Sequence, residues 1–159
     1  MISYRPLETG DLERYERETK TQFVTGDWCS PADLLEDWDK LRAYVLYDGD
    51  EWAGFCALTI GVPHVYNPNG AHFLQVVTFE PFRNKGYTRY LYKLLFENAR
   101  GLYKTACIHA DNLPSTAAAK RYGLERVGTH KQWDLYACAA DYFPDNLKSV
   151  RLEKRKTAE

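Results

Sequence analysis

The sequence predicts a mixed α/β fold, with one mixed, mostly antiparallel sheet of about six to seven strands flanked by about four helices. Three observations predict it. Apolar runs with the period of a strand alternate with helical stretches, a helix separates "FLQVVTF" from "TACIHA", and short turns such as "DGD" join other runs directly. A strand–helix–strand unit pairs in parallel and a hairpin pairs antiparallel, so the two connections together predict a mixed sheet with helices on its faces.

The chain begins with a predicted strand and two helices. "ISYRPL" alternates as a strand does, and Thr9 or Asp11 is placed to cap the helix after it. The second helix has the stronger start signal, because Ser30 as cap precedes Pro31, and Asp33 is placed to reach back to the cap. The apolar positions expected to face the core are Leu12, Tyr15, Thr19 and Phe23 in the first helix and Leu34, Leu35, Trp38 and Leu41 in the second.

The remaining elements follow from hairpin signals and helix boundaries. "AYVLY" and "EWAGFCALTI" are joined by the tight turn "DGD", and a polar loop leads into "HFLQVVTF". "RYLYKLLFENARG" has the apolar spacing of a helix, which Gly101 ends. "TACIHA" is a strand, "PSTAAAKRYG" is a short helix from Pro114 to Gly123, and "LERVGTH" and "WDLYAC" are the last strands. The predicted order is βααβββαβαββ.

One domain over residues 1–140 is expected, followed by a charged C-terminal extension over 141–159. The chain has 159 residues, of which 45% are hydrophobic, enough for one core. Beyond Ala140 the composition becomes charged, which favours a solvated tail, with a nucleic-acid patch as the alternative. The basic residues of this tail are Lys148, Arg151, Lys154, Arg155 and Lys156.

The overall composition argues against several classes of partner. With 21 basic and 22 acidic residues the net charge is -1, so the whole molecule has no electrostatic preference for nucleic acid or an anionic membrane. Its apolar runs are far shorter than the ~18 residues that span a bilayer, and "MISYRPLETGD" lacks the apolar core of a signal peptide. A soluble cytoplasmic protein is therefore predicted.

The cysteines and histidines predict no metal site. They are scattered and show no ligand spacing, so the cysteines are expected to be small buried hydrophobes in a reducing compartment. These residues are Cys29, Cys56, Cys107, Cys138, His64, His72, His109 and His130.

A basic turn, "FRNKGYT", lies between the predicted strand "FLQVVTF" and the helix after it. The start of a helix has unpaired N–H groups and partial positive charge, which suits an anion such as a phosphate. Neither G-x-x-x-x-G-K-S/T nor G-x-G-x-x-G is present. "RNKGYT" resembles the pyrophosphate loop of the GNAT acyltransferase superfamily, R/Q-x-x-G-x-G/A, at Arg83 and Gly86, with Thr88 in place of the last small residue.

A second segment extends this resemblance. "NLPSTAAAKRYGL" is similar to the family motif N-x-x-A/S that ends in G-F/L, with Asn112, Ser115, Gly123 and Leu124 at the family's spacing. "YRPLETGDLERY", "DGDEWAGF" and "ERVG" also look like family landmarks, so the resemblance covers about residues 2–138. It implies an N-acetyltransferase that uses acetyl-coenzyme A as co-substrate.

The resemblance also implies which residues bind the cofactor. The loop N–H groups from Arg83 to Thr88 would converge on the pyrophosphate, with Gly86 allowing close approach and Arg83 and Lys85 adding positive potential. Backbone groups of Val76 and its successors would hold the acyl carbonyl and the pantetheine arm. Asn112 and Ser115 would hold the pantetheine side or, as the alternative, only cap a helix. The expected cofactor-binding residues are Val77, Thr78, Phe79, Arg83, Asn84, Lys85, Gly86, Tyr87, Thr88, Asn112 and Ser115.

The resemblance leaves the catalytic acid and base open. Many relatives carry a tyrosine seven residues after the asparagine, to protonate the departing thiolate, but this position is Ala119 here. Tyr122, one turn further on, is the candidate acid, with packing against the sheet as the alternative.

The base of the histone-acetylating branch is a glutamate eleven residues before the loop motif, where this chain has His72. Strand alternation puts His72 on one face with Leu74, Val76 and Thr78, so we expect it to reach the cleft. The alternative is a partly exposed histidine at a strand start, and Glu80 and His109 are weaker candidates.

The leading hypothesis is an acetyl-coenzyme A-dependent N-acyltransferase acting on a primary amine. A GNAT-like binding or structural module that has lost its chemistry is the alternative, favoured by Ala119 and Thr88, and an acyltransferase of nucleic-acid base amines is a third. Acceptor, acyl chain length and oligomeric state stay open, with a homodimer as one option. Side chains that suit a cationic or aromatic acceptor, or only a solvated face, are Asp27, Trp28, Asp33, Glu36, Asp37, Trp38 and Asp39.

Overall fold

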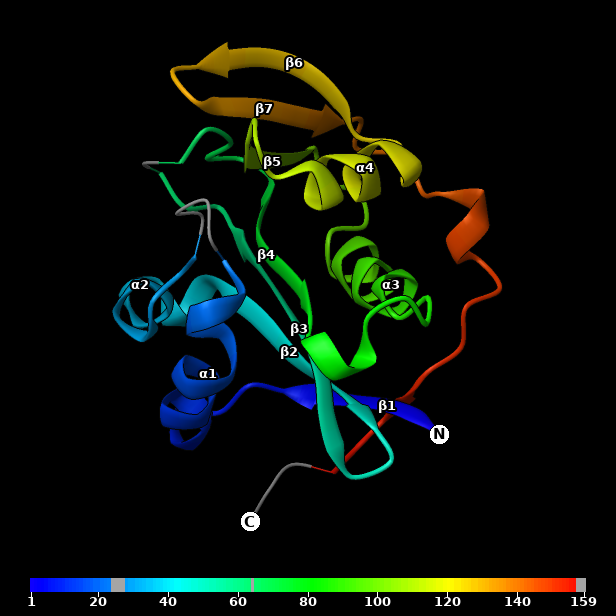
Figure 1. The fold of residues 1–159 in the computed structure, drawn as a ribbon. Helices are drawn as coiled ribbons and strands as arrows, with labels where there is room; N and C mark the ends of the chain where they lie inside the picture. The colour runs from blue at the N-terminus through cyan, green and yellow to red at the C-terminus, as the bar shows by residue number, and fades with distance from the viewer. Residues whose placement is uncertain (24–27, 64, 157–159) are drawn as a thin grey trace.

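The computed structural model describes residues 1–23, 28–63 and 65–156, so Asp27 and His64 lie outside the described residues. The predicted order of elements is confirmed, with one further short strand at the end (Figure 1). The helices are α1 (Leu12–Thr19), α2 (Pro31–Glu36), α3 (Thr88–Asn98) and α4 (Leu113–Arg121). The strands are β1 (Ile2–Pro6), β2 (Leu41–Asp48), β3 (Glu51–Ile60), β4 (Ala71–Thr78), β5 (Lys104–His109), β6 (Glu125–His130), β7 (Trp133–Cys138) and β8 (Glu153–Lys154).

The described strands form one mixed, eight-stranded sheet in the order β6-β7-β5-β4-β3-β2-β1-β8. β4 pairs in parallel with β5, β1 pairs in parallel with β8, and all other neighbours are antiparallel. α1 and α2 cover one face and α3 and α4 the other, so each face has its own core (Figure 1). α3 lies close to β3 at Gly54, where an added Cβ would meet a Leu91 methyl at 3.2 Å and the Val77 carbonyl at 2.9 Å.

The start of α2 is confirmed and its end differs from the prediction. The Ser30 hydroxyl accepts the Asp33 N–H and the Asp33 carboxylate accepts the Ser30 N–H, with Pro31 at the first helical position. The helix ends at Glu36, so Leu35 is 46% exposed and Leu41 belongs to β2 instead of the helix face.

Asp11, one of the two predicted caps of the first helix, is the N-cap of α1 by position but makes no capping hydrogen bond to it through its side chain. Glu8 and Asp11 form a capping box around a 3-10 turn, Thr9–Asp11, that precedes α1, so Thr9 is not the cap. Asp11, the residue before α1, uses its carboxylate to accept both Arg5 and the Glu8 N–H instead of capping that helix. Burial raises and these hydrogen bonds lower the pKa of Asp11, with a net lowering.

A bulge at Leu74 interrupts the alternation of β4. Gln75 pairs with Ala57 and Phe73 pairs with Leu58, which leaves Leu74 as an extra residue in β4. Two residues of β4 on opposite sides of the bulge therefore share a face only when they are an odd number of positions apart. The prediction that His72 shares a face with Val76 and Thr78 is wrong for this reason.

β4 and β5 separate at the bulge. They pair only at Ala71–Lys104, His72–Thr105 and Phe73–Ala106. β4 then continues along β3, and β5 continues along β7 to the pair His109–Trp133. The two central strands therefore splay apart, and the second half of β4 has an edge that no strand covers.

The C-terminal extension is packed onto the domain, and the expected solvated tail is wrong for residues 141–156. This segment passes α3 and ends beside β1, at the far edge of the sheet from β7 (Figure 1). Leu147 is fully buried, Val150 is 8% exposed, and the Arg155 N–H donates to the Tyr4 carbonyl at 2.6 Å. Apolar residues among the charges provide this anchoring. The boundary at residue 140 stays a prediction.

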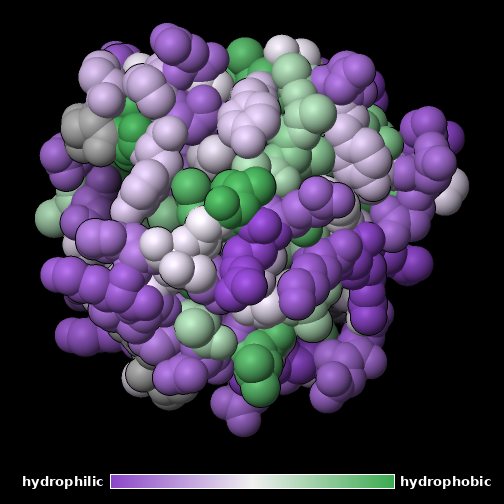
Figure 2. Space-filling model, turned by 90° about the horizontal axis from the view of Figure 1, so that it is seen from above, coloured by the Kyte–Doolittle hydropathy of each residue, from purple (hydrophilic) through white to green (hydrophobic). Residues whose placement is uncertain are grey.

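The described residues include neither a helix that could span a membrane nor a cluster of side chains that could hold a metal ion. None of the described helices is long and apolar enough to cross a membrane. Within the same residues, no group of three or more histidine, cysteine, aspartate or glutamate side chains is arranged to hold a metal ion. Seen from above, the surface is mostly hydrophilic, with small separate hydrophobic areas (Figure 2).

Candidate functional site

A groove of about 480 Å³ runs between the end of β4, the start of α3 and the start of α4. A second groove of similar volume lies under the C-terminal segment, away from the splayed strands. The first groove joins both segments that the sequence singled out and is the candidate site. Its lining residues are Gln22, Phe23, Val76, Val77, Thr78, Arg83, Asn84, Gly86, Tyr87, Thr88, Tyr92, Asp111, Asn112, Pro114, Ser115 and Ala118.

The loop from β4 to α3 has the backbone of an anion-binding turn. Asn84 and Gly86 both have positive φ, 64° and 76°. Helix α3 then starts at Thr88, and its N-cap, Tyr87, makes no capping hydrogen bond through its side chain. The Tyr90 N–H donates to the Tyr87 carbonyl, which leaves the Thr88 and Arg89 N–H groups, without a partner among the described residues, for an outside acceptor; the helix dipole favours a negative charge there.

Side chains fix this loop from three sides. The Arg83 Nε donates to the Thr78 carbonyl at 3.1 Å, and Arg83 Nη2 donates to Gln22 Oε1. The Tyr87 hydroxyl donates to Asp48 at 2.5 Å, a hydrogen bond that raises the pKa of Tyr87. The loop is thus tied to the turn after α1 and to the β2–β3 hairpin.

The threonine that replaces the family's small residue contributes to the same anchoring. The Thr88 and Thr78 hydroxyl oxygens lie 3.3 Å apart, within hydrogen-bonding distance. Thr88 therefore ties the first turn of α3 to the end of β4.

The exposed edge of β4 supplies backbone groups to the groove. The Phe79 N–H donates to the Ala53 carbonyl, so the alternation of an antiparallel pair directs Val77 toward β3 as well. The N–H groups of Val76 and Thr78 then point the other way, into the gap between β4 and β5. The Phe79 carbonyl accepts the Phe82 N–H, and the Phe79 side chain is only 3% exposed. Neither the backbone groups nor the side chain of Phe79 therefore face the groove.

A smaller cavity of about 40 Å³ occupies the gap between the splayed strands. It is lined by Phe73–Val76 of β4 and Ala106–Ile108 of β5, together with Phe23, Tyr92 and Ser115. Phe23, Val76, Tyr92 and Ser115 line both this cavity and the groove. These residues form the passage between the two spaces.

The start of α4 forms the opposite wall of the groove. Asn112 is the N-cap, and its side-chain oxygen accepts the Ser115 N–H at 3.3 Å. Both residues line the groove, so the predicted alternative of capping holds for Asn112 without removing it from the site.

Most of the predicted cofactor residues meet at this groove. Among the described residues, two of the predicted cofactor-binding residues, Phe79 and Lys85, do not line the groove. The Lys85 ammonium lies 5.6 Å from the Phe82 ring centre instead. Those that line the groove are Val77, Thr78, Arg83, Asn84, Gly86, Tyr87, Thr88, Asn112 and Ser115.

His72 lies on the face of the sheet opposite to Thr78. It is 7% exposed, and its Nδ1 lies 2.8 Å from the Thr105 hydroxyl. Burial lowers its pKa to about 4, so the imidazole is neutral at neutral pH. His72 lies on the side of the sheet that α1 and α2 cover. It is not among the described residues that line the groove or the small cavity.

The weaker candidates for a base are Glu80, which follows β4, and His109, which ends β5. Glu80 is exposed and begins the 3-10 turn Glu80–Phe82. His109 packs against Trp133, with 5.5 Å between ring centres, and its Nδ1 accepts the Asp111 N–H.

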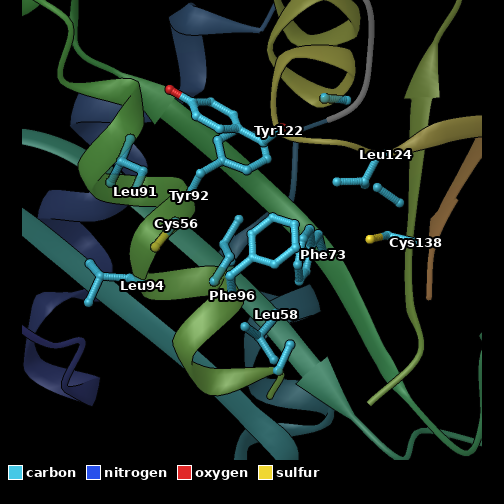
Figure 3. Packing of buried hydrophobic residues seen from close by; sticks show 14 of the residues in the cluster. Cys56, Leu58, Phe73, Leu91, Tyr92, Leu94, Phe96, Tyr122, Leu124 and Cys138 are labelled. Carbon is cyan, nitrogen blue, oxygen red and sulfur yellow. The ribbon is translucent and has the colours of Figure 1, made fainter. Parts of the chain in front are cut away.

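Tyr122 packs in the core. This agrees with the alternative given for it, packing in place of a role as the catalytic acid. It is 4% exposed and stacks on Tyr92, with ring centres 4.6 Å apart at an angle of 27° (Figure 3). Among the residues that line the groove, Tyr92 is present and Tyr122 is not.

The segment between α1 and α2 is held against β4 by a buried glutamine. Gln75 is 5% exposed, and its Oε1 accepts the Cys29 N–H at 2.8 Å and the Tyr15 hydroxyl at 3.4 Å. Of the predicted acceptor residues, Trp28 lies in this segment, and Asp33 serves in the capping box of α2.

Sequence reasoning missed several side chains of the site, namely Gln22, Phe23, Tyr92, Asp111, Pro114 and Ala118. Phe23 was assigned to the core face of the first helix. Tyr92 follows Thr88 by one helical turn, which is the available signal, because residues four apart share a helix face. The bond between Gln22 and Arg83 joins segments 61 residues apart and has no local sequence signal.

Comparison with known proteins adds to this geometry. Residues 11–124 match the profile of the Acetyltransferase (GNAT) family. A sequence comparison with curated proteins found no match.

Solved structures share the fold at low sequence identity. An acetyltransferase from Thermus thermophilus is similar with TM-score 0.69 and 17% identity, covering 87% of this chain and 96% of that one. The ribosomal-protein-S18-alanine N-acetyltransferase of Escherichia coli has TM-score 0.70 and 16% identity, covering 92% and 99%. The spermidine N-acetyltransferase of Vibrio cholerae, in complex with CoA and spermine, has TM-score 0.62 and 17% identity, covering 86% and 92%.

Proposed function

Since the chain belongs to the GNAT acetyltransferase family, we propose that it transfers an acetyl group from acetyl-coenzyme A to a primary amine. The observation that carries the proposal is the continuity of the groove, which leads from the loop before α3 to the gap between β4 and β5. An anion site and a site for a reacting carbonyl are thereby joined in one channel. The printed names of two structural neighbours, a spermidine and a ribosomal-protein alanine N-acetyltransferase, support an amine acceptor.

The residues present fit acetyl-coenzyme A. The open N–H groups at the start of α3 and the positive-φ residues Asn84 and Gly86 suit its pyrophosphate. The Val76 and Thr78 N–H groups, which point into the gap, suit the pantetheine amide and the thioester carbonyl. Acetyl-coenzyme A supplies the activated acyl group, and the protein holds it so that the amine can attack directly.

The acceptor amine must lose a proton before it attacks. An alkyl ammonium with pKa ~10.4 is almost wholly protonated at pH 7. His72 stays our proposed base, acting through water, because it lies on the side of the sheet where α1 and α2 approach. Its lowered pKa keeps the imidazole unprotonated but also makes it a weaker base than an ordinary histidine. The Thr105 hydroxyl at Nδ1 orients the ring and leaves Nε2 for the proton.

The third hypothesis, an acyltransferase of nucleic-acid bases, rests on the basic tail, and one of the cations of that tail, Arg155, is engaged within the domain. Arg155 is held by Asp50 at 3.1 Å and by the Gly49 carbonyl at 2.7 Å. Its guanidinium also lies 4.2 Å from the Tyr47 ring centre. We therefore propose no nucleic-acid partner.

Thermal denaturation with and without acetyl-coenzyme A tests the proposal. A ligand at ~100 times its Kd stabilises by ~2.7 kcal/mol, which raises the melting temperature of a domain of this size by roughly 5 to 10 °C. No shift at millimolar acetyl-coenzyme A would contradict the proposal and favour the binding module.

Gly86→Val tests the loop, and Gly101→Val is its matched control. Both glycines have φ of 76° and open space around an added Cβ, so a β-branched residue strains both backbones alike. Only Gly86 lines the groove, so we expect Gly86→Val to remove the cofactor-induced shift and Gly101→Val to keep it. Equal shifts in the two variants would show that the loop assignment is wrong.

A further inference from the structure

The departing sulfur needs a proton donor that the usual position does not provide. Under the proposed function, coenzyme A leaves as a thiolate beside the gap between β4 and β5. Ala119 stands where many family members have a tyrosine, and it is fully buried with only a methyl group to offer. Any donor in the protein must come from another element.

Tyr92 lies at the passage between the groove and the small cavity. Of the four residues that line both spaces, Phe23 and Val76 are apolar, which leaves Tyr92 and Ser115 with hydroxyl groups. A phenol, with an ordinary pKa of ~10, is far closer than an aliphatic alcohol to a thiol at ~8.5 and is the better matched acid. The location therefore selects Tyr92.

The Tyr92 hydroxyl has no other engagement. Within the described part of the chain, no hydrogen bond involves it. Tyr87, the other tyrosine of the groove, already donates its hydroxyl to Asp48. Tyr122 supports the Tyr92 ring by stacking against it between α3 and α4 (Figure 3). A hydroxyl with a fixed ring, no partner and an oxygen that is not itself buried is suited to an acceptor that is absent from the free protein.

We propose that Tyr92 is the proton donor to the leaving sulfur, in place of the tyrosine missing at position 119. The amine nitrogen forms a bond to the carbonyl carbon, and the C–S bond breaks with its electron pair on sulfur. The Tyr92 Oη–H proton moves to that sulfur, which gives free coenzyme A. The tyrosinate regains a proton from solvent, which receives the one that the amine lost, so the cycle is balanced.

The electrostatics of the position agree with this role. Burial raises the pKa of Tyr92, with a further contribution from Tyr122, so its proton is present at neutral pH. The same burial raises the proton affinity of a thiolate formed beside it. Donor and acceptor are therefore shifted in the same direction, which limits how far burial widens the difference between their pKa values.

The test is Tyr92→Phe, which keeps the ring and its stacking and removes one oxygen. Coenzyme A release is followed with hydroxylamine as acceptor, an amine that is mostly unprotonated at pH 7 and so bypasses the base. We expect kcat to fall about 10²-fold, with the Kd for acetyl-coenzyme A changed by less than about 3-fold. Tyr136→Phe, a fully buried tyrosine of the same core that lines neither space, is the control and should keep kcat.

A second donor separates proton transfer from positioning. In the selenium analogue of acetyl-coenzyme A the leaving selenol is much more acidic than a thiol and needs no protonation. With this analogue, the Tyr92→Phe defect should shrink to within about 3-fold. An equal defect with both donors, an unchanged kcat with the thioester, or a comparable loss in Tyr122→Phe would each overturn the role of Tyr92. Failure of the unsubstituted protein to bind acetyl-coenzyme A or to release coenzyme A would overturn the proposed function together with it.

Discussion

Buried His72 should make the protein lose stability as the pH falls, by an amount that follows from its pKa. The ordinary pKa of histidine is 6.5, and burial lowers that of His72 to about 4. The unfolded chain binds a proton below pH ~6.5 and the folded protein only near pH 4, so the histidine favours folding above 6.5 and this contribution is lost as the pH falls. At 1.36 kcal/mol per pH unit the full loss is about 3.4 kcal/mol, of which about 2 kcal/mol is lost by pH 5.

The assay is urea unfolding at pH 7, 6 and 5, for the native chain and for His72→Asn. Asn places a polar atom near the position of Nδ1, where it can still meet the Thr105 hydroxyl, and it does not titrate. We expect the stability difference between the two proteins to change by about 2 kcal/mol from pH 7 to pH 5, in favour of the variant. His130→Asn, at an exposed histidine, is the control. The stability difference between this variant and the native chain should change little from pH 7 to pH 5.

Parallel stability curves for the native chain and His72→Asn would refute the reasoning. They would mean that the folded protein admits a proton to His72 as readily as the unfolded chain does. The side chain would then be hydrated in solution, in disagreement with its 7% exposure.

Four further outcomes are expected. With an alkyl amine acceptor at pH 7, His72→Asn should lower kcat about 10²-fold, but with hydroxylamine it should leave kcat nearly unchanged; a loss with both would exclude a role as base. Ala119→Tyr should destabilise by about 1 to 3 kcal/mol, because a ring does not fit a fully buried methyl position, and should raise kcat no more than about 100-fold; thermal unfolding and turnover check both. Gln22→Ala removes one of the two acceptors of Arg83 and should weaken acetyl-coenzyme A binding a few-fold by calorimetry, whereas an unchanged Kd would show that this bond does not order the loop. Leu147→Ala should cost about 2 to 5 kcal/mol of unfolding free energy, and a cost under about 1 kcal/mol would contradict the packing of the C-terminal segment.

Local signals carried the correct parts of the sequence prediction. The start of α2 was predictable because a capping box with Pro31 is encoded within four consecutive residues, from Ser30 to Asp33. The loop before α3 was predictable for the same reason, since Gly86 and its neighbours need positive φ in a fixed short pattern. Each feature is determined by residues that are adjacent in the chain.

The parts that failed depend on distant contacts. Nothing in "DNLKSVRLEKRK" shows locally that Leu147 packs under α3 or that Glu153 and Lys154 pair with β1. The end of α2 was placed too late because Leu41 has helical spacing from Leu34, while its pairing with Thr59 makes it a strand residue. Tertiary pairing overrides a periodicity that is shared by both kinds of structure.

The bulge at Leu74 explains why strand alternation misplaced His72 and why that error bears on the mechanism. Without the extra residue, the side chains of His72 and Thr78 would lie on the same face of the sheet, on the same side of the gap between β4 and β5. With it, Thr78 faces the groove beside α3, while His72 faces the side where α1 and α2 approach. Under the proposed function, one strand then presents the cofactor from one face and receives a proton from an acceptor on the other, with the thioester in the gap between them. Bulges are frequent beside active sites because they re-aim side chains in this way. Deleting Leu74 should therefore abolish turnover by returning His72 to the cofactor face, even in a protein that still folds and binds acetyl-coenzyme A.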